Sequence, residues 1–80
     1  MKIRIKITLK ESVLDPQGQA IAVSLKNQGF SEINSVRQGK IIDVDMDGNS
    51  LEESKMLIEK MCHDLLINPQ IEVYSIEENE

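Results

Sequence analysis

The sequence lacks the residues that form disulfide bonds and structural metal sites, which often stabilise small proteins. Its 80 residues include one cysteine, Cys62, and one histidine, His63. A lone cysteine excludes an intramolecular disulfide, and one histidine beside it cannot supply the Cys/His cluster of a structural zinc site. Because a core of this size supplies only about 3–5 kcal/mol of net stability, self-association is the remaining way to supplement it.

Aromatic residues, basic residues and long apolar runs are also scarce. Phe30 and Tyr74 are the only aromatics, and 9 basic residues stand against 14 acidic ones, giving a net charge of −5. Nucleic acid is therefore an unfavourable partner, because its recognition needs clustered positive charge and stacking rings. No apolar run suits a signal peptide or a membrane span, so we expect a cytoplasmic chain without membrane contact.

Period-two alternation predicts the strands. Residues 2–10 alternate strictly and predict a strand with one buried face. Residues 32–47 are expected to be extended, with Gln38-Gly39 either turning a hairpin or kinking one long strand. Residues 71–77 predict a last strand that is apolar on both faces, so one face needs a second cover. The pairs that share a face are Ile71 with Val73 and Tyr74 with Ile76.

Capping signals predict two helices. Asp15-Pro16 is a strong start for a helix that runs to about Gln28, after which Gly29 ends it and Phe30 returns to the core. A second helix starts at Ser50 and stops at Asn68-Pro69. The expected buried stripes are Ala20, Ile21, Val23 and Leu25 on the first helix, and Leu51, Ser54, Ile58, Met61, Cys62 and Leu65 on the second.

The element order predicts one α+β domain over residues 1–80. The order is β-α-β-β-α-β, or β-α-β-α-β if the middle strand is only kinked, which is a ferredoxin-like arrangement. We expect an antiparallel sheet with both helices on one face. The basic face of the first strand, with Arg4, should then lie beside the acidic face that contains Asp43.

Sequence patterns that would indicate a metal-binding, catalytic or phosphate-binding site are weak throughout the chain. Asp43 to Gly48 resembles the opening of a calcium loop, but the twelfth position, which needs Glu, is Ser54. Cys62 and His63 are helix neighbours whose side chains point about 100° apart, so they cannot form a dyad. Neither Gly-rich phosphate-loop pattern occurs. We therefore expect no catalytic, cofactor-binding or metal-binding residue in this chain.

Some stretches are not explained by packing. They are VLDPQG at residues 13–18, VRQGK at residues 36–40 and NPQIE at residues 68–72. Together with Gly29-Phe30 and MCHDLL at residues 61–66, their order and spacing strongly resemble the PurS family over nearly the whole chain. PurS proteins are the small subunits of bacterial and archaeal phosphoribosylformylglycinamidine synthase.

This resemblance implies an enzyme of purine biosynthesis made of three proteins. A PurQ-like glutaminase releases ammonia from glutamine, and a large PurL-like synthetase uses it, with ATP and Mg, to convert formylglycinamide ribonucleotide to formylglycinamidine ribonucleotide. The small subunit would bridge the two and assist ammonia transfer, while supplying no reacting group. The resemblance also implies self-association as a dimer or tetramer.

Contact residues for these partners are expected in the unexplained stretches and on an uncovered sheet face. Each has a structural alternative: Asp15 and Pro16 can simply start a helix, and Asn68 can simply end one. A stand-alone, dimeric module that senses a small molecule is the alternative function. The candidate contact residues are Asp15, Pro16, Gln17, Arg37, Lys40 and Asn68, with Tyr74 and Ile76 on the uncovered face.

Overall fold

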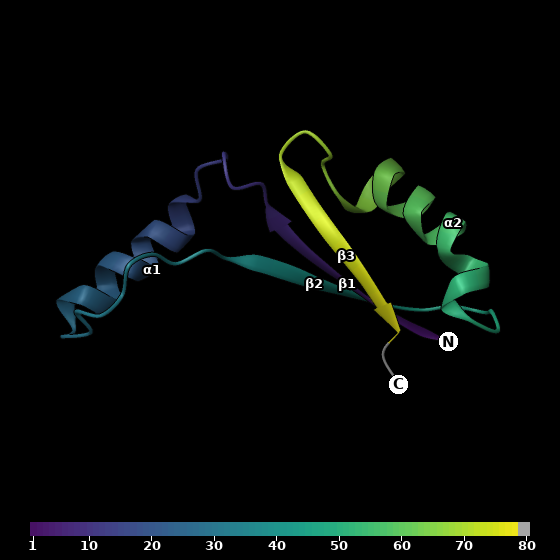
Figure 1. Cartoon of the computed structure of the whole chain (residues 1–80), viewed down its shortest axis with the longest axis horizontal. Coiled ribbons are helices and arrows are strands. Elements are labelled where there is room, and N and C mark those ends of the chain that lie inside the picture. The colour runs from purple at the N-terminus through teal and green to yellow at the C-terminus, as the bar shows by residue number, and fades with distance from the viewer. Residues whose placement is uncertain (79–80) are drawn as a thin grey trace.

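The computed structural model describes residues 1–78 and has the order β-α-β-α-β (Figure 1). This is one of the two predicted orders. The elements are β1 (Lys2–Leu9), α1 (Pro16–Asn27), β2 (Gly39–Asp45), α2 (Leu51–Met61), a π-helical turn η1 (Cys62–Leu66) and β3 (Glu72–Glu78).

The three strands form an antiparallel sheet in the order β2-β1-β3. Arg4 of β1 lies opposite Asp43 of β2, as expected from the charge pattern. The Arg4 guanidinium donates two hydrogen bonds to the Asp43 carboxylate, at 2.9 and 3.2 Å. This pairing lowers the pKa of Asp43 and raises the pKa of Arg4.

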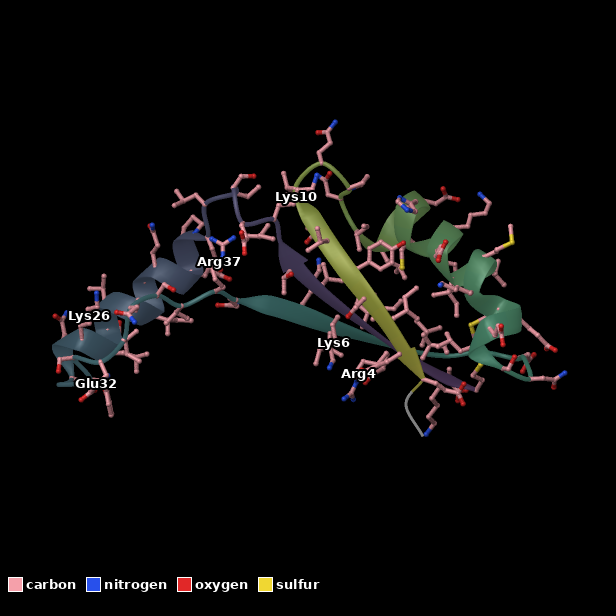
Figure 2. All side chains as sticks on the ribbon, in the orientation of Figure 1. Arg4, Lys6, Lys10, Lys26, Glu32 and Arg37 are labelled. Atoms are coloured by element: carbon pink, nitrogen blue, oxygen red, sulfur yellow. The ribbon has the colours of Figure 1, made fainter. Side chains whose placement is uncertain are left out.

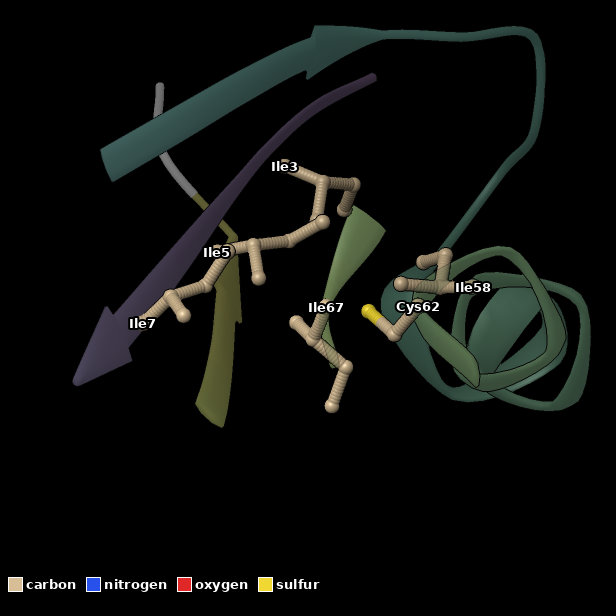
Figure 3. Packing of buried hydrophobic residues seen from close by; sticks show 6 residues of the cluster. All are labelled: Ile3, Ile5, Ile7, Ile58, Cys62 and Ile67. Carbon is tan, nitrogen blue, oxygen red and sulfur yellow. The ribbon is translucent and has the colours of Figure 1, made fainter. Parts of the chain in front are cut away.

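The core lies between one face of the sheet and α2 with η1. Ile3, Ile5 and Ile7 of β1 point toward the helical layer and are almost completely buried (Figure 3). They meet Ile58, Cys62 and Ile67 in one apolar cluster, which confirms the predicted buried face of the first strand.

The predicted stripe of the second helix is wrong at its end. Ser50 Oγ accepts a hydrogen bond from the Glu53 backbone N–H at 3.2 Å, so the predicted start is confirmed. The last turn is π-helical, and each π turn takes up more residues than an α turn. This change of period leaves Leu65 83% exposed, and Ile67, the extended residue that follows the π turn, enters the core instead.

The expectation that both helices cover one sheet face is also wrong. α2 covers the sheet, whereas α1 projects beyond its end and lies beside the returning segment of residues 31–38 (Figure 1). Of the predicted α1 stripe, Ile21 and Val23 are 40% and 58% exposed. Phe30 does not return to the core, since half of its surface is exposed. The buried residues of α1 are Gly18 and Ala22.

Residues 32–47 form neither a hairpin nor one long strand. Within this stretch only β2 pairs with β1, whereas residues 33–38 have no regular secondary structure and lie beyond the end of the sheet (Figure 1). The glycines with positive φ within residues 1–78 are Gly29 and Gly48, so Gly39 does not adopt the conformation that primed hairpin turns require. The chain therefore passes from the α1 region into β2 without reversing.

The uncovered sheet face is not the one that was predicted. Register with β1 places Tyr74 opposite Ile7 and Ile76 opposite Ile5, so both lie on the covered face and are half-buried against the core. Ile71 and Val73 occupy the open face instead and are exposed. Within residues 1–78, no helix has both the length and the apolar content needed to cross a membrane.

Candidate functional site

The unexplained sequence stretches meet where α1 joins the sheet. The loop after β1, the start of α1, the entry to β2 and the first residue of β3 all contribute side chains there. Figure 2 shows Arg37 at this junction, between the sheet and α1. We call it the root site and define it by Asp15, Gln17, Arg37, Gln38, Lys40 and Glu72.

Asp15 is the centre of the root site and is only 4% exposed. One carboxylate oxygen accepts a hydrogen bond from the Gly18 backbone N–H at 2.9 Å, and the other accepts one from the Gln38 backbone N–H at 2.6 Å. These two donors, with Gln38 the stronger, lower the pKa of Asp15 and keep it charged. Asp15 therefore caps α1, as predicted, and also ties the helix to the entry of β2.

Gly18 leaves no room for a side chain at this junction. A Cβ atom on Gly18 would collide with the Val36 carbonyl oxygen and would lie 2.7 Å from Asp15 Oδ2. The absence of a side chain therefore lets α1 approach the segment before β2 closely enough for Asp15 to reach Gln38.

Arg37 fastens the loop that leads into α1. Its guanidinium donates hydrogen bonds of 2.9 Å to the carbonyl oxygens of Lys10 and Val13. The Lys10 carbonyl oxygen also accepts a turn hydrogen bond from the Val13 backbone N–H at 2.9 Å, so the guanidinium adds a second donor to this turn. Arg37 thereby holds residues 10–13 against the entry to β2.

The remaining polar groups of the root site also bind one another. Gln38 Nε2 donates to Gln17 Oε1 at 2.9 Å, and Lys40 Nζ lies 3.6 Å from Glu72 Oε2. Glu72 Oε1 accepts a hydrogen bond from the Asn68 backbone N–H at 2.7 Å, which attaches the loop after η1 to the site. The site is therefore an ordered polar surface built from four separate segments.

A small cavity of about 180 Å³ opens at the root site. Pockets that bind small molecules are usually about 300–1,000 Å³, so this one is undersized for a nucleotide. It can admit a single side chain or a short stretch of backbone. Its lining residues are Ile7, Thr8, Leu9, Asp15, Gln17, Gln38, Gly39, Lys40 and Glu72.

Cys62 and His63 point to different environments. Cys62 is buried in the core, and burial raises the pKa of its thiol. His63 is exposed, its Nε2 lies 3.5 Å from the Tyr74 hydroxyl, and the two rings meet edge-on at 5.9 Å. Among the described residues, no group of three or more His, Cys, Asp or Glu is arranged to hold a metal ion.

The structure brings most of the predicted contact residues together. Asp15, Gln17, Arg37 and Lys40 belong to the root site, Pro16 is the first residue of α1, and Asn68 is joined to the site through Glu72. Tyr74 and Ile76 lie apart from it, beneath α2. Gln38 and Glu72 were missed, although both belong to the motif stretches that signalled the others.

Comparisons with known proteins give one consistent match. A family model described as "PurS: Phosphoribosylformylglycinamidine (FGAM) synthase" matches residues 2–80. The PurS subunit of Methanocaldococcus jannaschii is 40% identical over 75 residues, covering 94% of this chain and 90% of that protein. The PurS subunit of Bacillus subtilis is 38% identical over 79 residues, covering 99% and 93%.

Solved structures give the same result. The crystal structure of M. jannaschii PurS superimposes with a TM-score of 0.85 at 40% identity, covering 99% of this chain and 98% of that one. A chain of the PurLQS structure from Thermotoga maritima has a TM-score of 0.86 at 28% identity, with coverage of 98% and 95%.

Proposed function

The chain belongs to the PurS family of phosphoribosylformylglycinamidine synthase subunits, and from that premise we propose that it joins a PurL-like synthetase to a PurQ-like glutaminase. Its membership makes it a subunit of a glutamine-dependent ligase of purine biosynthesis. The PurLQS structure from T. maritima supports the partnership.

In this proposal the chain organises the complex and takes no part in bond making. The synthetase uses ATP and Mg, and the glutaminase supplies ammonia. Ammonia that escapes to water at neutral pH is protonated to ammonium, which is not a nucleophile, so holding the two active sites in register protects the reaction. The chain acts in the same compartment as these cytoplasmic enzymes.

The root site carries the proposal. Residues from the family-like motifs meet there, and their polar groups are engaged with one another instead of being aimed at a reacting centre. An ordered surface with a shallow cavity suits docking of a partner's side chain or loop. At the root site a stand-alone sensor of small molecules is less well supported, because the cavity there is only about 180 Å³.

We place the partner contacts on the exposed members of the predicted set. Five of them are exposed and lie in the root site or next to it: Pro16, Gln17, Arg37, Lys40 and Asn68. The other members are buried or half-buried, so they do not contact a partner directly. Asp15 holds α1 against the entry to β2, while Tyr74 and Ile76 pack between β3 and the core.

Self-association as a dimer or tetramer belongs to the same proposal. Exposed apolar side chains support it within the described chain: Ile41 and Val73 on the open sheet face, and Ile21 and Val23 on different sides of α1. Association that covers such side chains removes their apolar surface from water and is favourable for that reason.

Reconstitution tests the proposed function. Synthetase and glutaminase are mixed with formylglycinamide ribonucleotide and ATP, with or without this chain, and product formation is measured with either glutamine or ammonium chloride as the nitrogen source. We expect omission of the chain to abolish the glutamine-supported rate and to spare the ammonium-supported one. An unchanged glutamine-supported rate would show that the chain does not connect the two enzymes.

A charge reversal locates the docking surface. Lys40→Glu changes an exposed root-site cation, and Lys55→Glu makes the same change on α2, away from the site. We expect at least about a tenfold weaker complex for Lys40→Glu and no change for Lys55→Glu, measured by titration of the labelled chain into the two enzymes. Equal affinities would remove the root site from the interface.

A further inference from the structure

The loop between β1 and α1, residues 10–15, carries an exposed leucine. Leu14 lies in the VLDPQG stretch, which packing does not explain, and 63% of its surface is exposed. The residues on either side differ from it, because Val13 is half-buried and Asp15 is buried. Single exposed apolar side chains are common on soluble proteins, so the setting of Leu14 decides whether it has a role.

The backbone is fixed on both sides of Leu14. The Val13 carbonyl oxygen accepts a hydrogen bond from the Arg37 guanidinium, and the Val13 N–H donates one to the Lys10 carbonyl oxygen, each at 2.9 Å. On the other side, the Asp15 carboxylate accepts hydrogen bonds of 2.9 and 2.6 Å from two backbone N–H groups. The leucine is therefore presented on an ordered loop, although most of its own surface faces solvent.

The same loop is attached to the segment before β3. The Lys10 N–H donates a hydrogen bond to the Ile71 carbonyl oxygen at 2.8 Å. Arg37 joins the loop to the entry of β2, so the loop is held from both sides of β1. An apolar side chain on a backbone that is already ordered costs less conformational entropy to bury in a complex. This leucine is thus prepared for a contact with another molecule.

Basic side chains dominate the accessible surface around the loop. These cations are Lys10, Arg37 and Lys40. Figure 2 shows the first two beside the loop. Two carboxylates that lie among them are largely withdrawn from solvent, since Asp15 is 4% exposed and the Glu72 side chain 15%. Glu11 is the exposed acidic residue of the loop. The accessible charge here is therefore mainly positive, in a chain whose net charge is −5.

The root-site cavity opens beside this loop. Asp15 and Gln17, which follow Leu14 in the chain, line its volume of about 180 Å³. A partner that receives Leu14 can therefore place one of its own side chains in the cavity. Contacts made in both directions give the close shape fit that specific interfaces have.

We infer that Leu14 is the apolar contact through which this chain docks onto a partner enzyme. The complementary surface is an apolar pocket with carboxylates at its rim. Burial of the leucine supplies affinity, while the surrounding cations select the acidic rim and set the orientation. The inference rests on the proposed function, and it names the chemistry of the surface that the partner presents.

Substitution at Leu14 tests this contact. Leu14→Ala removes most of a side chain that is exposed in the free chain, so the circular dichroism spectrum should not change. We expect the dissociation constant of the complex to rise at least about tenfold, measured by titration of the labelled chain into the synthetase and glutaminase together. Leu14→Met keeps an apolar side chain of similar volume and should bind nearly as tightly as the wild type. Met56→Ala, at an exposed apolar position on α2, is the matched control and should bind normally.

Two results would overturn the contact. Equal affinities for Leu14→Ala and Met56→Ala would show that the leucine stays outside the interface. We also expect the free Leu14→Ala chain to have the same mass as the wild type in light scattering. A changed mass would place the leucine between copies of this chain instead of against a partner enzyme.

A charge reversal tests the acidic rim. Lys10→Glu leaves the backbone hydrogen bonds of residue 10 in place, and Lys55→Glu makes the same change on α2. Charges at the rim of an interface act mainly on association, so Lys10→Glu should lower the association rate at least about tenfold at low salt, whereas Lys55→Glu should not. Equal rates for the two variants, or faster association of Lys10→Glu, would refute an acidic rim.

The result can be told apart from failure of the proposed function. If the wild-type chain supports glutamine-dependent synthesis but Leu14→Ala binds like Met56→Ala, only the contact is refuted. If Leu14→Ala weakens binding but the wild-type chain leaves that synthesis unchanged, the contact stands and the proposed function is wrong. A wild-type chain that binds neither enzyme would refute both.

Discussion

The chain has two ends that bury their apolar residues to very different extents: the sheet with α2, which we call the sheet end, and residues 16–38, which we call the arm (Figure 1). In β1, Ile3, Ile5 and Ile7 are almost inaccessible, and the helical layer above them completes a core. In the arm, Ile21 and Val23 remain exposed although the helix that contains them is well capped. The contrast shows that correct local structure does not ensure a complete core within one chain.

The two ends also differ in what holds them. Apolar packing holds the sheet end, whereas polar contacts around Asp15 and Arg37 hold the base of the arm. Packing of this kind is insensitive to pH, but a carboxylate clasp is not. The two ends should therefore respond differently to substitution, dilution and acid.

The largest effect is expected from truncation at the centre of the sheet. Ile5→Ala removes a fully buried side chain that lies opposite Ile42 and Ile76, and should lower the free energy of unfolding by about 3 kcal/mol. Ile21→Ala in the arm should have a smaller effect that depends on protein concentration. Urea unfolding at two concentrations measures both. The contrast fails if Ile21→Ala matches Ile5→Ala at every concentration.

The next effect is expected at the base of the arm. Gly18→Ala brings a methyl group against the Val36 carbonyl oxygen and the Asp15 carboxylate, and overpacking of this kind costs about 1–3 kcal/mol. Ser24→Ala, on an exposed position of the same helix, is the control. Thermal unfolding should separate the two variants. Equal stability would mean that the close approach at Gly18 relaxes freely.

A smaller, pH-dependent effect is expected for Asp15→Asn. The folded pKa of Asp15 is lowered, so its carboxylate stabilises the fold fully above the unfolded value of about 4 and loses this effect as the pH falls through the folded pKa. The stability gap between wild type and Asp15→Asn should thus be constant near neutral pH and shrink in acid. Chemical unfolding at several pH values measures it, and a gap that widens in acid contradicts the clasp.

The smallest effect is expected on the open sheet face. Arg4→Gln removes an ion pair with Asp43 in which both side chains are partly exposed to solvent, so the free energy of unfolding should change little. Any change should vanish in about 1 M salt, where charges are screened beyond about 3 Å. Unfolding midpoints at low and high salt test this. A large loss that persists in salt would mean that the face is as important as the core.

Much of the sheet end could be predicted from sequence because its signals are local. Strict alternation identified the buried isoleucines of β1, and opposite charges identified Arg4 and Asp43 as neighbours. Ser50 marked the start of α2 correctly. The π turn could not be predicted, because the residue types in this segment do not distinguish a π turn from an α turn. The burial of Leu65 was mispredicted for that reason.

The position of the arm could not be predicted from sequence, because an apolar stripe on a helix does not specify the surface against which the helix packs. The caps of α1 were predicted, but the two-helix layer over one sheet was not found. The root site was better predicted: Asp15, Gln17, Arg37 and Lys40 were singled out because packing did not explain them. Their mutual hydrogen bonds could not be predicted, since they join segments far apart in the chain.

The most direct test combines a root-site variant and its control with the reconstituted enzyme. Glutamine-supported synthesis of formylglycinamidine ribonucleotide is measured with the wild-type chain, with Lys40→Glu and with Lys55→Glu, each at the concentration that half-saturates the wild-type reaction. Docking through the root site predicts equal activity for the wild type and Lys55→Glu, and little for Lys40→Glu. Equal activity from Lys40→Glu and Lys55→Glu would contradict it.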